Sequence, residues 1–248
     1  MNQKMIIDSH MHCGEELPFE VIAPLLKRAG IQGACLFAPV EDIYDRYDYN
    51  FTDSPYWRHK RKNANRYLLN LFHPEFKTFP YLFVWNDFDY EELSFPYKGI
   101  KWHRHEDEPV YNYSDKRCRQ LIEKITELEL PIVFEESTYN TVNFVNKLAP
   151  QAVVIIPHLG LLNGGFESIA SSGIWEKENL YADTSLAPVY AIKEFIRRYG
   201  SHKLLFGSDF PFGQPDAELI KILNLKLPKE EEENILGRNI LRLLKIST

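Results

Sequence analysis

The sequence lacks several features that would assign it to a particular class of protein. No apolar run reaches the roughly 18 residues that a membrane-spanning helix needs, which argues against an integral membrane protein. Excess positive charge is also missing: 35 acidic residues outnumber 29 lysines and arginines, so neither nucleic acid nor an anionic membrane is expected as a partner. The three cysteines, Cys13, Cys35 and Cys118, are odd in number and too widely spaced for a disulfide framework.

The N-terminal residues 1–8 show no positively charged segment followed by an apolar one, as a secretory leader would. Because unpaired cysteines suit a reducing compartment, a cytoplasmic protein is expected. No repeat or low-complexity linker divides the chain, and its 248 residues match the ~250 of a typical TIM barrel. We therefore expect a single domain over residues 1–248.

Eight short apolar runs recur along the chain, and most are followed by a segment of helical periodicity. Such runs are typical of parallel strands that are covered on both faces. Eight strands alternating with helices favour a closed (β/α)8 TIM barrel over an open, doubly wound sheet. The expected strands are Met5–Asp8, Gly33–Pro39, Tyr81–Trp85, Gly99–His103, Pro131–Glu135, Ala152–Pro157, Leu180–Asp183 and Lys203–Gly207.

Two connections between these strands depart from an ordinary helix. Residues Asp89–Ser94 leave room only for a turn or a single helical turn. Residues Glu41–Arg61 carry many aromatic and charged side chains and are expected as a long loop, which either covers a small polar substrate or packs against its own scaffold. The expected helices are Phe19–Ala29, Asp115–Glu129, Asn140–Leu148, Val189–Tyr199 and a closing helix at Glu230–Leu244.

Chemically reactive side chains stand where several expected strands end, which is where a parallel barrel places its active site. Alternation puts Asp8, His10 and His12 on one face of the first strand, so two imidazoles can reach one ion. Taken singly, a histidine or aspartate at a strand end is more often a satisfied core residue or a helix cap. Their coincidence at four strand ends favours a metal centre. The candidate ligands are His10, His12, Glu135, His158 and Asp209.

These residue types would provide the chemistry of a hydrolase. A divalent ion such as Zn²⁺ lowers the pKa of bound water to about 7. Asp209 can accept the proton of that water, and His158 can polarise the carbonyl of a substrate, so both are predicted to be catalytic.

The expected fourth strand carries a second group of polar residues. Lys101 and His103 share one face, and Arg104 and His105 follow. A lysine inside a barrel is costly unless it is paired or used chemically, and an ion pair with Glu135 is the leading interpretation. Lys101, His103 and Arg104 are candidate contacts to a substrate, and Arg46, Arg58 or Arg104 is able to face a carboxylate.

Four segments, at 8–12, 99–103, 157–160 and 205–211, resemble the amidohydrolase superfamily, and the nearest branch includes aminocarboxymuconate-semialdehyde decarboxylase. The resemblance spans Asp8 to Leu244 and implies a metal-dependent barrel hydrolase. It also implies that His10 and His12 are metal ligands, and that Asp209 is both ligand and general base. The matching histidine, His158, is a ligand in some members and a catalytic residue in others.

The chain departs from this family on the fifth strand, where Glu135 stands in place of an expected histidine. Zinc is the metal expected at this centre. A carboxylate on the fifth strand would weaken Zn²⁺ as a Lewis acid and favour a harder ion such as Mn²⁺, which makes manganese the alternative. Lys101 is alternatively the modified bridging lysine of two-metal members.

The sequence therefore predicts a metal-dependent hydrolase that uses metal-activated water on an amide, lactone or related bond of a small polar molecule. A non-oxidative decarboxylase with the same metal site is the alternative enzyme. A binding protein with a degraded centre is the alternative that Glu135 suggests. The expected partner is a small-molecule substrate, and self-association into a homo-oligomer is a further expectation.

Overall fold

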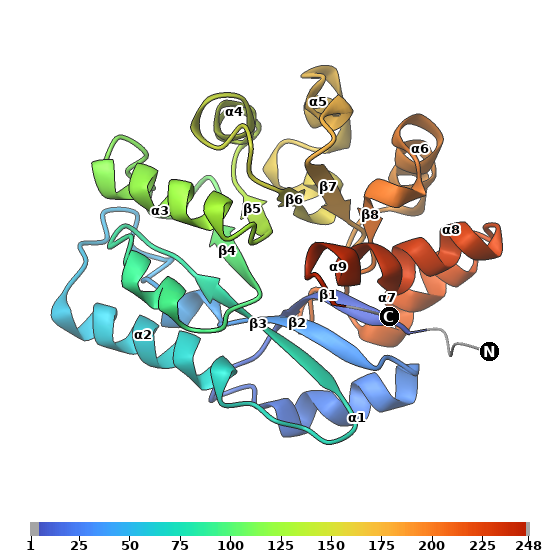
Figure 1. The fold of residues 1–248 in the computed structure, drawn as a ribbon, viewed down its shortest axis with the longest axis horizontal. Coiled ribbons are helices and arrows are strands. Elements are labelled where there is room, and N and C mark those ends of the chain that lie inside the picture. The colour runs from blue at the N-terminus through green and yellow to red at the C-terminus, as the bar shows by residue number, and fades with distance from the viewer. Residues whose placement is uncertain (1–4, 247–248) are drawn as a thin grey trace.

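The computed structural model describes residues 5–246, and its strands lie inside a ring of helices (Figure 1). All eight strands are parallel and lie in the sheet in the order of the chain. This arrangement confirms the predicted (β/α)8 barrel. The strands are β1 Ile7–His12, β2 Gly33–Phe37, β3 Lys77–Phe83, β4 Gly99–His103, β5 Ile132–Glu135, β6 Val154–Ile156, β7 Leu180–Asp183 and β8 Leu204–Leu205.

The barrel closes between β1 and the residues that follow the short strand β8. The Ser9 amide donates to the Phe206 carbonyl at 2.8 Å, and the Asp209 amide donates to the His10 carbonyl at 2.7 Å. Further along, the His12 amide donates to the Phe210 carbonyl at 2.9 Å. The backbone of His10 and of Asp209 is therefore part of the closing contact itself.

The helices vary in length, and several end in short 3₁₀ or π turns. None of the helices described is both long and apolar enough to cross a membrane. The α-helices are α1 Phe19–Ala29, α2 Pro55–Leu69, α3 Lys116–Glu127, α4 Thr138–Asn143, α5 Phe166–Ser171, α6 Val189–Tyr199, α7 Pro215–Leu223, α8 Lys229–Glu233 and α9 Asn239–Leu243. The shorter turns are η1 Val40–Asp42, η2 Tyr90–Ser94, η3 Phe144–Leu148, η4 Pro157–Asn163, η5 Ile174–Glu176, η6 Ser201–Lys203 and η7 Asn234–Arg238.

Helix α1 is one of two helices whose bounds were predicted correctly. Its buried residues Phe19, Ile22, Ala23 and Leu26 follow the helical repeat, and Gly30 ends the helix with a φ of 72°. Helices α1 and α6 have the predicted bounds. The other predicted helices appear with shifted ends, and the closing helix is built from α8, η7 and α9.

The expected loop 41–61 is wrong over its second half, where α2 begins. The Ser54 hydroxyl accepts a hydrogen bond from the Trp57 amide, and Pro55 occupies the first turn, so a complete start signal is present. Two of its four buried residues, Arg61 and Asn65, are polar, so the helix shows no obvious apolar stripe. Strand β3 begins at Lys77 rather than at the predicted Tyr81. Its first half is partly exposed and includes Pro80, so it lacks the continuous apolar run from which the strand was predicted.

An apolar layer inside the barrel supports the polar residues above it. Val133 and Glu135 alternate along β5, so the apolar layer gives way to a polar one towards the C-terminal end of the strand. Ile240 and Leu241 of α9 belong to the same inner cluster, which places the closing helix against the opposite end. The site is thus held on a packed interior.

Candidate metal centre and active site

Two histidines of β1 converge on one carboxylate that follows β8. The Nε2 atoms of His10 and His12 lie 3.4 and 3.3 Å from Asp209 Oδ1. Asp209 itself has a φ of 56°, a left-handed backbone that aspartate tolerates better than most residues. Gly207 lies so close to β1 that a Cβ there would meet the His10 Cβ at 3.0 Å. The geometry thus brings together three of the predicted metal ligands.

Each of these histidines is oriented by an oxygen beside its other ring nitrogen. A ring whose Nδ1–H donates to such an acceptor keeps the Nε2 lone pair for a metal, as in many metal sites. His158 is held by Nδ1 in the same way. The contacts are His10 Nδ1 to Asp183 Oδ2 at 2.8 Å, His12 Nδ1 to the Ala38 carbonyl at 3.4 Å and His158 Nδ1 to the Ser185 carbonyl at 3.1 Å.

Among the described residues, His10, His158 and Asp209 offer ligand atoms within 4.8 Å of one another, and all three are buried. Burial is the main cause that lowers the pKa of His10, which keeps its imidazole neutral. Burial raises the pKa of Asp209, but the neighbouring His10 and His12 lower it by more, so the carboxylate is ionised. Neutral imidazole, as at His10, and carboxylate, as at Asp209, are the donors that divalent ions such as Zn²⁺ and Mn²⁺ take, so these two residues fit a divalent metal.

Asp183 is a site residue that the sequence reasoning missed. Its Oδ2 accepts from His10, and its Oδ1 accepts from the backbone amides of His158 and Ser185 at 3.1 and 3.0 Å. Burial would raise the pKa of Asp183, but His10, its own hydrogen bonds and His158 lower the pKa to about 2. The signal was available, because Asp183 ends the predicted seventh strand as the other site residues end theirs.

Glu135 lies among positively charged and donor groups. Its Oε2 is 2.8 Å from Lys101 Nζ, which confirms the predicted ion pair, and its Oε1 is 3.0 Å from His105 Nε2. The Nε2 atoms of His158 and His103 are 3.4 and 3.6 Å from the same Oε1. Burial raises the pKa of this carboxyl, but these neighbours, Lys101 first, lower it well below its usual range. Both oxygens are thus in contact with donors, and the role of Glu135 as a metal ligand stays a prediction.

A second cluster, His103, His105 and Glu108, follows β4 and also has metal-ligand spacing. The Nδ1 atom of His103 lies 3.4 Å from Glu108 Oε2, which also accepts from the Tyr44 hydroxyl at 2.8 Å. The Arg46 guanidinium forms an ion pair with the other oxygen of Glu108. Because a guanidinium already neutralises the only carboxylate of this cluster, we do not assign an ion to it. The sequence reasoning noted His105 but did not include it among the site residues.

Arg104 was predicted to contact a substrate, but the hydrogen bonds of its guanidinium lie within its own loop. The guanidinium donates to the carbonyls of Glu106, Glu108 and Pro109 at 2.9, 3.1 and 3.2 Å. It also lies 3.6 Å from Glu136. In this arrangement Arg104 stabilises the loop that carries His105 and Glu108. Its role towards a substrate stays a prediction.

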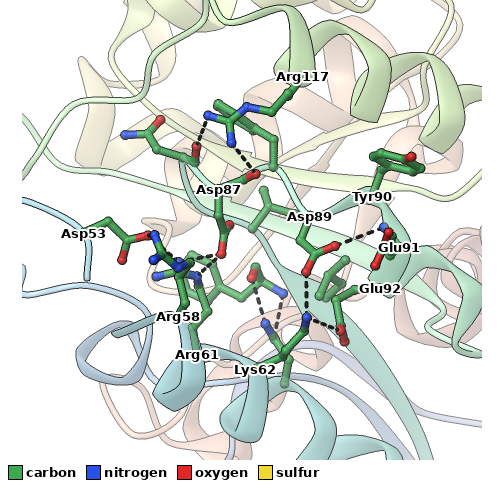
Figure 2. Close-up of a pocket in the computed structure, with 16 residues that line it drawn as sticks. Asp53, Arg58, Arg61, Lys62, Asp87, Asp89, Tyr90, Glu91, Glu92 and Arg117 are labelled. Carbon is green, nitrogen blue, oxygen red and sulfur yellow. Dashed lines mark hydrogen bonds and ion pairs between the residues drawn. The ribbon is translucent and has the colours of Figure 1, made fainter. Parts of the chain in front are cut away.

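A separate groove of about 620 Å³ lies outside the barrel, between α2 and the segment that contains η2 (Figure 2). It forms where the third strand is followed by η2 instead of a full helix. The described residues that line it include none of the candidate ligands, and its charges largely pair with one another. The pairs join Arg61 to Asp53 and Asp87, and Lys62 to Asp89 and Glu92.

A family model of amidohydrolases matches residues 7–246. This chain belongs to the amidohydrolase family. The match confirms the resemblance that the strand-end motifs indicated, and it covers the whole of the barrel described above. No functionally curated protein matches this chain.

Solved structures share the fold of this chain at low identity. A 2,6-dihydroxybenzoate decarboxylase from Rhizobium is 14% identical, with a TM-score of 0.75 over 98% of this chain and 99% of that one. A candidate 2-pyrone-4,6-dicarboxylic acid hydrolase from Pseudomonas putida is 16% identical, with a TM-score of 0.69 over 99% of both chains. A dihydroxybenzoic acid decarboxylase from Polaromonas, with bound manganese and 2-nitroresorcinol, is 14% identical, with a TM-score of 0.70 over 98% of this chain and 97% of that one.

Proposed function

We propose that this amidohydrolase is a metal-dependent hydrolase that cleaves a lactone, amide or related bond of a small polar molecule. The observation that carries the proposal is the position of Asp209, buried and ionised, with one oxygen 3.3 to 3.4 Å from the Nε2 atoms of His10 and His12. A carboxylate held beside two metal-binding nitrogens is placed to serve as a base next to the ion. Zn²⁺ is the proposed ion, and Mn²⁺ is the alternative.

When bound, the ion supplies Lewis acidity, which makes water a better nucleophile and a carbonyl a better electrophile. Asp209 accepts the proton that the attacking water loses and delivers it to the leaving group. Since its pKa lies below the usual value, Asp209 is ionised at neutral pH, the form in which a carboxylate accepts a proton.

His158 is suited to hold negative charge that develops on the substrate oxygen. Burial lowers the pKa of His158, but Glu135 raises it by more, and the pKa reaches about 9. A protonated imidazole with Nδ1 fixed by the Ser185 carbonyl can direct its Nε2–H towards an oxyanion. We therefore propose His10, His12 and Asp209 as the metal ligands and His158 as the residue that stabilises the transition state.

A decarboxylase is the second candidate, because two of the compared structures belong to dihydroxybenzoate decarboxylases. The Lys101 ammonium near Glu135 would attract a substrate carboxylate, and the imidazoles of His103 and His105 would donate hydrogen bonds to it. Hydrolysis is preferred here because Asp209 is held as an ionised base, and a base is what the activation of water requires.

The two reactions differ in their products, and that difference provides the test. Protein reconstituted with Zn²⁺ or Mn²⁺ would be incubated with a panel of lactones, amides and aromatic carboxylic acids in heavy-oxygen water. Incorporation of one labelled oxygen per product molecule without release of CO₂ supports hydrolysis. Release of one CO₂ per product molecule would contradict hydrolysis and assign decarboxylation to this chain. The Asp209→Asn variant serves as the inactive control in both assays.

A further inference from the structure

Lys101 occupies an unusual place for a lysine, since it is completely buried at the middle of the barrel. Its Nζ lies 2.8 Å from Glu135 Oε2 and 3.1 Å from His10 Nε2. It also stands 5.1 Å above the ring of Phe37. One buried ammonium therefore contacts both a carboxylate and a nitrogen that we assign to the metal centre.

The contact with His10 uses the electron pair that a metal would need. Because the Nδ1–H of His10 donates to Asp183 at 2.8 Å, its Nε2 is unprotonated and accepts from Lys101. A ring nitrogen has a single lone pair, so it cannot serve the ammonium and a metal ion at the same time. In addition, the positive charge of the ammonium repels a divalent cation at short range.

Glu135 keeps the ammonium in this place. The other oxygen of Glu135 is held by His105 at 3.0 Å, so the carboxylate is fixed from two sides. An ammonium engaged in this way serves as a resident cation and not as an anionic bridge between two metal ions. The pair therefore leaves room for one ion in the centre.

We infer that Lys101 is a resident competitor of the metal at His10, clamped by Glu135, and that it sets a weakened affinity for a single divalent ion. The inference rests on the metal centre of the proposed function. It assigns Lys101 a tuning role, through His10, that is separate from any contact with the substrate. It also gives Glu135, the residue that departs from the family pattern, a function as the clamp of that lysine.

The test is a titration of metal-free protein with ZnCl₂ and with MnCl₂ by calorimetry, with the metal content of the loaded protein measured separately. We expect one equivalent of ion in the native chain. We expect Lys101→Met, which keeps the length of the side chain and removes the charge, to bind the ion about tenfold more tightly or better, the scale on which neighbours of metal ligands act.

Lys203→Met is the matched control. Lys203 is also a buried lysine, but it lies in η6, ahead of β8, and donates to the carbonyls of Trp175 and Lys177. Its replacement removes the same charge from a similarly buried position without touching His10. We expect this variant to keep the native affinity.

Lys101→Met leaves the charge of Glu135 buried without its partner and could unfold the barrel. A second comparison, between Glu135→Gln and the double variant Lys101→Met/Glu135→Gln, therefore measures the effect of Lys101 without an unpaired carboxylate. Tighter binding by the double variant supports the inference. If the native protein binds an ion but the loss of Lys101 leaves the affinity unchanged in both backgrounds, the inference is wrong and the proposed metal centre stands. If no variant binds either ion, the metal centre and the inference fall together.

Discussion

Asp183 accepts a hydrogen bond from His10 at 2.8 Å, and both side chains are completely buried. The pair fixes which nitrogen of His10 carries the proton and which points to Asp209. A carboxylate behind a metal-binding imidazole also makes the imidazole a stronger donor. The metal affinity of the proposed centre is thus expected to depend on Asp183, which is not itself proposed as a ligand.

Replacing Asp183 by asparagine should therefore weaken metal binding. The amide lacks the negative charge and can present its NH₂ group to His10, so we expect a loss of about 10–100-fold in affinity. Calorimetric titration of the metal-free variant measures it. Asp107→Asn, a change at an exposed loop position, should leave the affinity unchanged. Equal affinities in the two variants would contradict the role assigned to Asp183.

The variant Asp209→Asn should lose turnover by about 10²–10⁴-fold because the base is removed. The fold should survive, since the change is nearly isosteric and the backbone hydrogen bond from the Asp209 amide to His10 remains. Steady-state kinetics on the substrate found by the panel, together with thermal unfolding, check both statements. Asp216→Asn, at the first turn of α7, is the matched control and should keep its rate. A near-native rate in Asp209→Asn would show that the base is elsewhere.

Asp8 should make the stability of the protein depend on pH. Burial is the main cause that raises its pKa from 3.8 to about 7. The folded protein therefore keeps a proton that the unfolded chain has already lost, and stability falls as the pH rises from about 4 to 7. The slope is up to about 1.4 kcal/mol per pH unit.

Urea denaturation of the native chain and of Asp8→Asn at several pH values measures this slope. The asparagine can still accept the hydrogen bonds that Oδ1 receives from the amides of His10 and Ser208, and it does not ionise. We expect the variant to gain stability relative to the native chain as the pH rises towards 8. Parallel curves for the two proteins would mean that Asp8 is ionised in the folded state at the pH values tested.

The Lys101–Glu135 ion pair should show strong coupling in a double-mutant cycle. Glu135→Leu leaves a buried ammonium without its carboxylate, which should cost about 3–5 kcal/mol of unfolding free energy. Lys101→Met/Glu135→Leu should recover much of that loss, since no unpaired charge remains. Urea denaturation of both single variants and the double variant gives the coupling. Additive effects would indicate that the two residues contribute independently.

The strand ends were accessible from the sequence because the signals there are local. His10 and His12 are two residues apart, His158 directly follows an apolar run, and Asp209 stands two residues after the end of another. The contacts of Glu135 with His103 and His105 are of a different kind, since they depend on the register in which β4 pairs with β5, where His103 lies opposite Glu135. No pattern within a single strand states that register, so the network around Glu135 could be predicted only in part.

Helix α2 and the loop contacts of Arg104 show two other limits. The sequence contains the helix-start signal of α2 at Ser54 and Pro55, but the many aromatic and charged residues of 41–61 suggested a loop instead. Arg104 has the chemistry of a carboxylate binder, and only the structure shows that backbone carbonyls surround it. Residue type indicates what a side chain can bind, whereas the path of the loop decides what it meets.

The residues of the proposed catalytic centre also close the barrel. The amide hydrogens of Asp209 and His12 lie in bonds that join the last strand segment to the first, because β8 itself spans only Leu204–Leu205. Opening of the sheet at this point would therefore separate Asp209, the proposed base, from His10 and His12. Amide hydrogen exchange at these two positions would report directly whether the centre is intact. An ion bound to residues on both sides of this contact would stabilise the closed barrel against unfolding.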